Sequence, residues 1–591
     1  CSNMCHEASG VALAQSVGVG KGTVTFDDFE HADAIFVWGQ NPGTNHPRML
    51  EPLREAVKRG AQVVCFNPLK ERGLERFQHP QHALKMLTNG SEPLNTAFFR
   101  PALGGDLAAL RGMAKFLLQW HREALAQGEP AVFDLAFIAE HTHGVDDYLA
   151  LLDASSWDSL VEQSGLSLDE LQHAALLYRR AERVIICWAM GITQHHNSVA
   201  TIQEIVNLQL LRGNLGRPGA GLCPVRGHSN VQGDRTMGIN ERPSATFLDA
   251  LEQRFNFQVP RAQGHNTVEA INAMLDGQAK VFIGLGGNFA QATPDSPRSH
   301  AALSRCALTV QISTKLNRSH LTTGADALIL PCLGRTDIDQ QAGGPQAVTV
   351  EDSFSMIHAS YGQLEPLSAQ MRSEPAIIAG IAKATLGNHP VDWDALIADY
   401  RRIRELIADT IPGFSDFNQR LQHPGGFYLG NAAAERRWLT ASNKANFKAN
   451  SLPADLLPPQ VRNTGQTPDL ILQTLRSHDQ YNTTIYGLDD RYRGVKGQRQ
   501  VLFVNEADIL RLGFQPGQQV DIQSIWDDGI ERKVVGFTLL AFDIPAGQAA
   551  AYYPEANPLV PLQSFGAGSF TPTSKYVAIR LQAHQATARI L

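Results

Sequence analysis

Residues 34–38 read Ala-Ile-Phe-Val-Trp and are followed directly by Gly39. A short apolar run of this kind that ends in glycine is typical of a parallel strand buried on both faces. Residues 49–59 are compatible with a helix, and residues 62–66, Gln-Val-Val-Cys-Phe, form a second apolar run. This order predicts a β-α-β unit of a doubly wound α/β sheet.

The same alternation returns further along the chain. Val-Ile-Ile-Cys-Trp at 184–188 precedes a helix-compatible stretch at 198–211. Similar apolar runs lie at 281–285, 308–312 and 327–330. Because alternating strands and helices are typical of parallel sheets covered by helices, we expect an α/β fold with two doubly wound, Rossmann-like domains.

The C-terminal part follows a different pattern. Runs separated by Gly, Pro and Asp turns predict strands at 501–504, 519–525, 532–539 and 576–581. We interpret this tail as a β-barrel domain. Upstream of it, apolar residues recur at helical spacing from Trp393 to Ile407, which predicts one amphipathic helix that faces the core.

Length and composition narrow the class of protein. A chain of 591 residues is too long for one core, and 43% hydrophobic with 18% charged residues is ordinary for a globular enzyme. The net charge of −7 provides no basic surface for nucleic acid, and no apolar run has the length of a membrane span. The seven cysteines are scattered without a C-x-x-C pair, which favours a reducing compartment, and we expect a cytoplasmic protein.

Two segments contain residues suited to redox chemistry. Cys5-His6 places a thiol beside an imidazole, and residues 226–234, Arg-Gly-His-Ser-Asn-Val-Gln-Gly-Asp, place an arginine in a glycine-flanked polar loop. A lone cysteine is more commonly a buried apolar residue, and most arginines pair with acids at the surface. A soft thiolate, a titratable ring and a guanidinium are nevertheless the parts of a metal centre that acts on a small anion.

These segments resemble the molybdopterin oxidoreductase superfamily, and most of all its formate-dehydrogenase-like members. The likeness extends through residues 38–42, 213–221 and 476–482, and so covers nearly the whole chain. Within the superfamily it is nearest to the subgroup associated with bacterial acid resistance. The resemblance implies the same two α/β domains and the same C-terminal barrel.

The resemblance also implies roles for individual residues. Cys5 matches the ligand of molybdenum, or of tungsten, in a bis-molybdopterin guanine dinucleotide cofactor, and His6 matches the residue that takes the substrate proton. Arg226 matches the active-site arginine that anchors the anion. His228 departs from the pattern, because formate dehydrogenases of this type carry glutamine there, and formate specificity is therefore open. His46, His195 and His196 lie near these motifs, where structural or solvated roles are at least as common.

Further positions match segments that contact the pterins in the family. Most follow predicted strands, where backbone groups can approach a phosphate or nucleoside closely. In the α/β domains they are Gly39, Gln40, Asn41, Asn67, Gly191, Gln194, His228, Asn288, Lys315 and Asn317. In the barrel they are Ser477, His478, Gln480, Asn482, Asn557 and Lys575. Each match is weak by itself, since a glycine after a strand can simply form a turn and a polar cluster can simply cap a barrel.

Family members carry cysteines for an iron–sulfur cluster upstream of the metal ligand, and those cysteines are absent from this sequence. We therefore expect a [4Fe–4S] cluster only in a longer protein, which would also carry the first part of the second α/β domain. The domains expected here are 1–227, 228–450 (incomplete) and 465–591. The expected partners are an anionic small-molecule substrate and an electron-acceptor protein.

Two other classes of protein stay open. One is a structural homologue that keeps the fold but has lost the cofactor; the joint presence of Cys5, His6 and Arg226 argues against it. The other is a general nucleotide-binding α/β protein, since Rossmann-like strand ends bind many ligands. It is weakened because no clean G-x-G-x-x-G follows the first strand.

Overall fold

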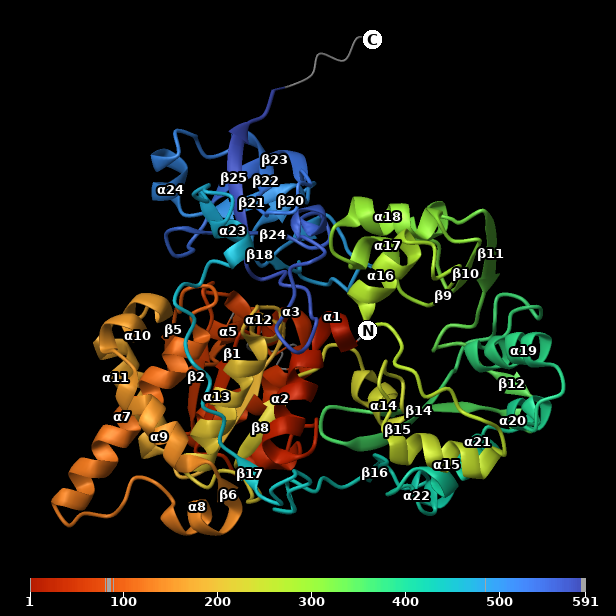
Figure 1. The fold of residues 1–591 in the computed structure, drawn as a ribbon, viewed down its shortest axis with the longest axis horizontal. Helices are drawn as coiled ribbons and strands as arrows, with labels where there is room; N and C mark the ends of the chain where they lie inside the picture. The colour runs from red at the N-terminus through yellow and green to blue at the C-terminus, as the bar shows by residue number, and fades with distance from the viewer. Residues whose placement is uncertain (1, 80, 82–86, 89, 484, 586–591) are drawn as a thin grey trace. The chain divides into compact units, whose positions relative to one another are not determined.

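The computed structural model describes residues 2–79, 81, 87–88, 90–483 and 485–585 (Figure 1). The chain packs into two compact units, Cys1–Gly227 with Asn431–Leu591, and His228–Gly430. The first unit combines a parallel α/β sheet with a closed barrel, and the second contains a smaller parallel sheet. The expected mixed α/β class with a C-terminal barrel is therefore confirmed.

The first unit is built on a five-stranded parallel sheet with the order β5-β2-β1-β7-β8. Its strands are β1 (Ala34–Trp38), β2 (Gln62–Phe66), β5 (Ala97–Phe99), β7 (Val184–Trp188) and β8 (Gly221–Pro224). Every side chain of β1 is buried, and Val37 pairs with Cys65 on one side and Cys187 on the other. Burial on both faces explains why the predicted strands at 34–38, 62–66 and 184–188 are apolar except at the half-buried Gln62.

Helices cover this sheet. The longer ones are α2 (Glu7–Val17), α4 (Leu50–Arg59), α7 (Asp106–Ala126), α11 (Leu168–Arg180) and α13 (Ser198–Leu211). The shorter ones are α1 (Ser2–Cys5), α3 (Pro42–Asn45), α5 (Arg72–Glu75), α8 (Leu135–His141), α9 (Val145–Ala154), α10 (Trp157–Ser164) and α12 (Met190–Thr193).

Local sequence explains where two of these helices begin and end. Ser167 and Glu170 form a reciprocal capping box at the start of α11, with the Ser167 amide 2.8 Å from the Glu170 carboxylate. Gly60 ends α4 with a φ of 92°, a left-handed conformation that glycine adopts without strain. The helices predicted at 49–59 and 198–211 correspond to α4 and α13.

The second unit has a three-stranded parallel sheet, β11-β10-β9, and an antiparallel sheet, β14-β15-β16. The strands are β9 (Val281–Leu285), β10 (Leu308–Ser313), β11 (Asp326–Pro331), β14 (Ala347–Glu351), β15 (Met356–Tyr361) and β16 (Phe427–Tyr428). Its longer helices are α15 (Ala245–Phe255), α16 (Thr267–Leu275), α18 (Ser296–Ser304) and α19 (Glu374–Leu386).

The single helix predicted from Trp393 to Ile407 is wrong. The chain forms α20 (Trp393–Ala398) and α21 (Arg401–Thr410), and Asp399 between them is extended, with φ −153° and ψ 110°. The Asp399 carboxylate accepts from the Arg401 amide at 3.0 Å, and the amide of Tyr400 donates to Gln346 at 2.7 Å. These side-chain contacts replace helical hydrogen bonds and interrupt the helix. The apolar residues nevertheless keep their spacing of about 3.6 residues across the interruption.

The C-terminal part of the first unit is a closed barrel in the order β18-β24-β21-β23-β22-β25 (blue in Figure 1). Its strands are β18 (Leu470–Leu475), β21 (Val501–Val504), β22 (Gln519–Ser524), β23 (Lys533–Ala541), β24 (Gln548–Tyr552) and β25 (Val577–Ala583). Four were predicted within a few residues. The sequence pattern missed β18 and β24, and the alanines of β24 have low strand propensity outside a packed barrel.

Residues 431–450 pack with the first unit, whereas the sequence-based boundary places them in the second domain. The backbone carbonyl of Lys448 accepts from Asn207 at 2.9 Å, and that of Asn450 accepts from the buried Arg111 at 2.6 Å. The division into three domains stays a prediction. Within the described residues, no helix combines the length and apolarity needed to cross a membrane.

Candidate functional site

Cys5 lies where helix α1 ends and helix α2 is about to begin. The loop after β7 holds this junction, because Thr193 Oγ1 donates to the Cys5 carbonyl at 2.5 Å and Gln194 Nε2 donates to the Met4 carbonyl at 2.9 Å. The Cys5 side chain is only 8% exposed. The N-terminal segment is thus fixed at the carboxyl edge of the parallel sheet, where ligands of open α/β sheets bind.

Three groups around the Cys5 sulfur favour its thiolate. Burial raises the pKa of Cys5, but the charge of Arg476, the backbone amide of Gly227 and the charge of Arg226 all act in the opposite direction. A cysteine surrounded by cations and backbone N–H groups is the environment of a reactive or metal-binding thiol. In the part of the chain that the structure describes, no group of three or more His, Cys, Asp and Glu side chains is arranged as a metal site.

His6 is buried beside Cys5. Its Nδ1 lies 3.1 Å from Ser9 Oγ, which also accepts from Trp188 Nε1 at 2.9 Å. Burial, followed by the charges of Arg226 and His46, lowers the pKa of His6 well below its ordinary value. A charged His6 ring would be desolvated beside a guanidinium, so the ligand-free protein favours the neutral ring.

Arg226 follows β8 and is 7% exposed. Its Nη2 donates to the Gly20 carbonyl at 2.8 Å, and its backbone carbonyl lies 3.1 Å from Nε2 of His46. Its charge lowers the pKa of both Cys5 and His6, so the guanidinium is close to both side chains. The structure thus brings together the three predicted catalytic residues, which lie on two distant parts of the sequence.

The two predicted glycines after β1 and β7 pack against each other. Gly191 donates its amide to the Gly39 carbonyl at 2.9 Å, and a Cβ on Gly191 would lie 2.4 Å from that oxygen. Gly39 has a φ of 54°. Both glycines therefore allow close approach of two strand-end loops, which is a structural reason for their presence.

Predicted polar residues on these loops have buried atoms that have no hydrogen-bond partner among the described residues. These atoms are Oε1 of Gln40, Oδ1 and Nδ2 of Asn41, and Oε1 of Gln194. Asn67 differs, since its Nδ2 donates to the Gln40 carbonyl at 3.4 Å and its Oδ1 accepts from Leu69. Because buried polar groups are normally satisfied, the unpartnered amides indicate a place for a polar ligand.

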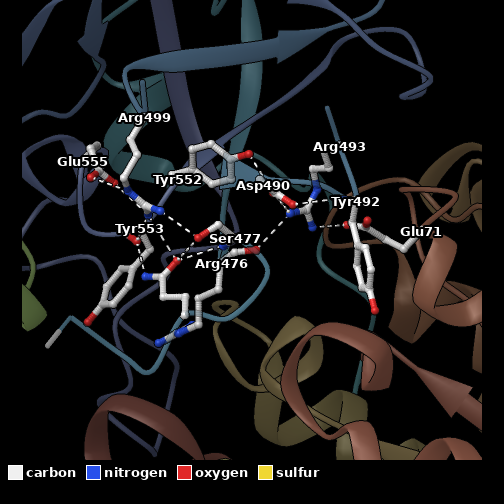
Figure 2. Close-up of polar contacts among 11 residues, drawn as sticks. Glu71, Arg476, Ser477, Asp490, Tyr492, Arg493, Arg499, Tyr552, Tyr553 and Glu555 are labelled. Carbon is white, nitrogen blue, oxygen red and sulfur yellow. Dashed lines mark hydrogen bonds and ion pairs between the residues drawn. The ribbon is translucent and has the colours of Figure 1, made fainter. Parts of the chain in front are cut away.

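The barrel contributes a polar loop, residues 476–482, which we name the Arg476 loop (Figure 2). Ser477 donates its amide to Oε1 of Gln480 at 2.8 Å, and Nε2 of Gln480 donates to the Asn482 carbonyl at 2.7 Å. The His478 ring packs against that of Tyr492, with centroids 4.0 Å apart and a tilt of 32° between the rings, and its Nδ1 is buried without a hydrogen-bond partner in the described part of the chain. The predicted barrel residues of this loop therefore form one connected group.

Asn557 and Lys575 are buried in the same unit as this loop. Asn557 hydrogen-bonds to Tyr553, over whose ring the Arg476 guanidinium lies at 4.5 Å. Lys575 bonds to the Thr474 carbonyl, and its backbone amide donates to the Gln194 carbonyl at 3.2 Å. Burial, with the charges of Arg476 and Arg493, lowers the pKa of Lys575 to about 7. This is a cationic environment in which an anion would be stabilised.

The remaining predicted residues belong to the second unit. Asn288 and Asn317 follow β9 and β10 and lie close together, since Ser319 Oγ donates to Asn288 Oδ1 at 3.0 Å and Asn317 Nδ2 donates to the Gly287 carbonyl at 2.7 Å. Lys315 is on the same strand-end loop as Asn317 and is exposed. His228 opens this unit. The four residues are not placed here relative to Cys5.

Sequence reasoning missed Asp106, which lines a pocket of the first unit. Asp106 is the first residue of α7, and burial raises the pKa of its carboxyl to about 7. His195 shares the pocket, and burial lowers the pKa of His195 to about 4. The rest of the lining includes Gly104, Asn197, Thr573 and Tyr576. The sequence feature that could have pointed to Asp106 is its position at the start of a helix that follows β5.

Arg476 was also missed as a functional residue, although it opens the quoted stretch 476–482. Its charge is the strongest of those that oppose the effect of burial on the pKa of Cys5. Its neighbours Ser477 and Gln480 were predicted by motif, whereas the proximity of Arg476 to a residue 471 positions earlier is visible only in the folded chain.

Comparison with known proteins identifies the family. The family model for molybdopterin oxidoreductases matches residues 1–331, more than half of the chain. The chain therefore belongs to the molybdopterin oxidoreductase family, and the predicted membership and oxidoreductase class are confirmed.

Individual relatives cover nearly the whole chain. An uncharacterized oxidoreductase of Mycobacterium tuberculosis (strain H37Rv) is 51% identical over 588 residues, which are 98% of this chain and 74% of that protein. Protein YdeP of Escherichia coli (strain K12) is 48% identical over 587 residues, 98% of this chain and 76% of YdeP. Formate dehydrogenase H of the same organism is 32% identical over 238 residues, 40% of this chain and 29% of that enzyme.

The fold is also found in a solved structure. Acetylene hydratase from Pelobacter acetylenicus matches 99% of this chain and 81% of its own, with a TM-score of 0.67 and 14% identity. At that identity the likeness concerns the fold alone.

The residues of the first unit fit a pterin-bound metal. A thiol is a soft metal ligand, and Cys5 supplies one at the sheet edge. Unpartnered amides of Asn41 and Gln194, the half-buried Arg476 and the buried Lys575 suit a ligand that carries polar rings and phosphates. Membership of the family thus agrees with the chemistry of these side chains.

Proposed function

We propose that this chain binds a molybdenum or tungsten bis-molybdopterin guanine dinucleotide through Cys5 and catalyses a two-electron conversion of a small anion such as formate. The observation that carries the proposal is the buried Cys5 thiol at the carboxyl edge of the parallel sheet, close to the charges of Arg226 and Arg476. When bound, the metal centre supplies the two-electron chemistry. Likeness to formate dehydrogenase H over part of the chain supports the substrate class.

Arg226 is the residue we assign to the anion. Its planar guanidinium can donate two parallel hydrogen bonds to a carboxylate-like oxyanion. The contact of Nη2 with the Gly20 carbonyl and the contact of His46 with its backbone hold the side chain in place. Arg226 therefore orients the substrate before any electron moves.

His6 is the residue we assign to the proton. Its pKa is lowered in the ligand-free protein, so the ring is neutral and able to accept a proton at a ring nitrogen. Since Nδ1 faces Ser9, we assign the exchange to Nε2. The trio of Trp188, Ser9 and His6 keeps the ring orientation fixed.

The Asp106 pocket supports the guanine form of the cofactor. A guanine base offers two adjacent N–H donors, which match the two oxygens of one carboxylate. Burial alone raises the pKa of Asp106 to about 7, and two donated hydrogen bonds would stabilise its ionised form. Gly104 and Asn197 line the same pocket as that carboxyl.

We further propose that an electron-acceptor protein is the redox partner, and that a [4Fe–4S] cluster is present only in a longer form of the protein. His228 replaces the neutral amide of formate dehydrogenases with a titratable ring, which favours an anion other than formate or an acidic working pH.

Metal and pterin analysis tests the proposal. Purified wild-type protein should carry about one molybdenum or tungsten and two pterin dinucleotides per chain, and Cys5→Ala should lose the metal and turnover. Cys65→Ala is the matched control, because Cys65 is an equally buried thiol in strand β2. Full activity in Cys5→Ala, or wild-type protein without metal and pterin, would contradict the proposal and favour a cofactor-free homologue or a nucleotide-binding protein.

Substrate class is tested by dye-linked assays with formate and other small anions from about pH 5 to 8. A titrating His228 should make His228→Gln change the pH profile of turnover and the ratio of kcat/KM between anions. An unchanged profile and an unchanged ratio would remove His228 from substrate selection.

A further inference from the structure

Arg499 holds the Arg476 loop from behind (Figure 2). Its Nη1 donates to Ser477 Oγ at 2.7 Å, and its Nη2 donates to Gln480 Oε1 at 3.1 Å and to the Tyr553 carbonyl at 3.0 Å. The Glu555 carboxylate accepts from Nε at 2.7 Å. One planar guanidinium thus fixes two side chains of the loop and the backbone of the tyrosine under Arg476.

Arg493 holds the same loop at its first residue. Its Nη1 donates to the Arg476 carbonyl at 3.0 Å and to Asp490 at 2.8 Å, while its Nη2 donates to Glu71 at 2.5 Å. Glu71 belongs to the segment after β2, so this contact links the loop to the parallel sheet domain. Figure 2 shows Glu71, Arg493 and Asp490 in one row.

Both arginines are buried, and burial of a charged side chain costs free energy. Their side chains are 3% and 5% exposed, and Asp490 and Glu71 are almost as buried. Although burial opposes its ionisation, Arg493 together with the hydroxyl of Tyr552 lowers the pKa of Asp490. Buried ion pairs add little net stability compared with apolar packing of the same volume. In this protein the buried ion pairs fix the geometry of the Arg476 loop.

We propose that Arg493 and Arg499 are positioning residues, which set the Arg476 loop beside Cys5 before the cofactor binds. This inference rests on the proposed function of the Cys5 site. Ser477, Gln480 and the Arg476 carbonyl are all held by these two arginines, and the Arg476 guanidinium lies over the Tyr553 ring at 4.5 Å. The two arginines lie outside every motif that the sequence indicated.

Hydrogen exchange of the cofactor-free protein tests the loop directly. Amides of residues 476–482 should exchange at least about tenfold faster in Arg499→Met and Arg493→Met, because each variant loses several charge-assisted hydrogen bonds. Arg532→Met is the matched control. Arg532 is a buried arginine of the same barrel, 2% exposed, which pairs with Asp528 at 2.6 Å. It should lower stability without changing exchange at 476–482.

Two milder variants keep the test valid if a methionine variant does not fold. Arg499→Lys keeps the buried charge but cannot bond Ser477, Gln480 and Tyr553 with one planar fork, so the loop should still loosen. Glu555→Gln removes the ion pair of Arg499 and leaves its contacts with the loop, so exchange at 476–482 should stay as in the wild type.

Cofactor retention supplies the second measurement. Arg499→Lys should lose molybdenum and pterin about tenfold faster on dilution than Arg532→Met and Glu555→Gln, at a comparable melting temperature. If loop exchange and cofactor loss in Arg499→Lys equal those of Arg532→Met while the wild type carries metal, the positioning role is wrong. Wild-type protein without metal would instead overturn the proposed function, whatever the exchange data show.

Discussion

The three arginines that we assign to the Cys5 site and to the Arg476 loop differ in what surrounds them. Arg226 lies between Gly20 and His46, and Arg476 lies over the ring of Tyr553. Arg499 donates five hydrogen bonds, two of which go to Glu555. Composition alone treats them as equal charges. Burial and bonding separate a guanidinium that can bind a ligand from one that is already saturated.

Replacement of Arg226 should weaken substrate capture. In Arg226→Ala, KM for the active anion should rise about 10- to 150-fold, because one charge-assisted bidentate contact is worth about 1.5–3 kcal/mol. Metal content should change little. Arg183→Ala, which removes a half-exposed arginine paired with Asp33, serves as the control. Unchanged kinetics in Arg226→Ala would remove the anion role.

Lys575 should make the cofactor-free protein less stable at low pH. Its folded pKa of about 7 is lower than that of an ordinary lysine, so the unfolded chain binds more protons between about pH 7 and 10.5. The penalty is complete below pH 7 and disappears as pH rises through that window. Lys575→Met should therefore gain about 2–4 kcal/mol relative to the wild type at pH 6, and less at pH 9, in urea unfolding. An equal difference at both pH values would contradict the shifted pKa.

At the scale of elements, the site depends on how loops meet at the carboxyl ends of parallel strands. The loops after β1, β2, β7 and β8 carry Gln40, Asn67, Gln194 and Arg226 to one edge of the sheet. The apolar runs were enough to predict β1, β2 and β7, whereas β8 was not predicted as a strand. The broken helix α20–α21 was not predictable, because side chains of other segments bond Tyr400 at the break.

Replacement of Gly191 tests whether the strand-end loops must pack closely at this edge of the sheet. Gly191→Ala should destabilise the protein by about 1–3 kcal/mol, since its Cβ would lie 2.4 Å from the Gly39 carbonyl oxygen in a packed region. Gly380→Ala is a suitable control, because Gly380 lies in helix α19 with nothing within 4 Å of its Cβ. That variant should be neutral or up to about 1 kcal/mol more stable. Thermal unfolding compares the two, and equal melting temperatures would show that the loops can separate without cost.

At the scale of the whole molecule, the segment that returns from the second unit is tied into the core of the first. Arg111 pairs with Glu204 at 3.0 Å with both side chains fully buried, and it also bonds the Asn450 carbonyl. Tyr148 donates to the same carboxylate at 2.9 Å. A charged pair at such depth is costly unless every group is bonded, so loss of one partner should affect the entire unit.

Arg111→Met should lower the free energy of unfolding by about 3–5 kcal/mol, because Glu204 would stay buried without its partner. Arg122→Met removes the bidentate pair with Asp153, in which both side chains are at least half exposed, and should cost less than about 1 kcal/mol. Urea unfolding measures both. A small effect of Arg111→Met would show that water or a local rearrangement compensates the carboxylate.

The sequence by itself determined six strands of the parallel sheets, four strands of the barrel and the family, because apolar periodicity and local motifs are properties of contiguous residues; it did not indicate β5 and β8. It also named Cys5, His6 and Arg226 through their motifs. Only the tertiary structure revealed the lowered pKa of His6, the proximity of Arg476 to Cys5 and the anchoring of the Arg476 loop by Arg493 and Arg499. Those features arise from burial and from groups that are between 17 and 471 positions apart in the sequence, and electrostatic coupling depends on distance in space.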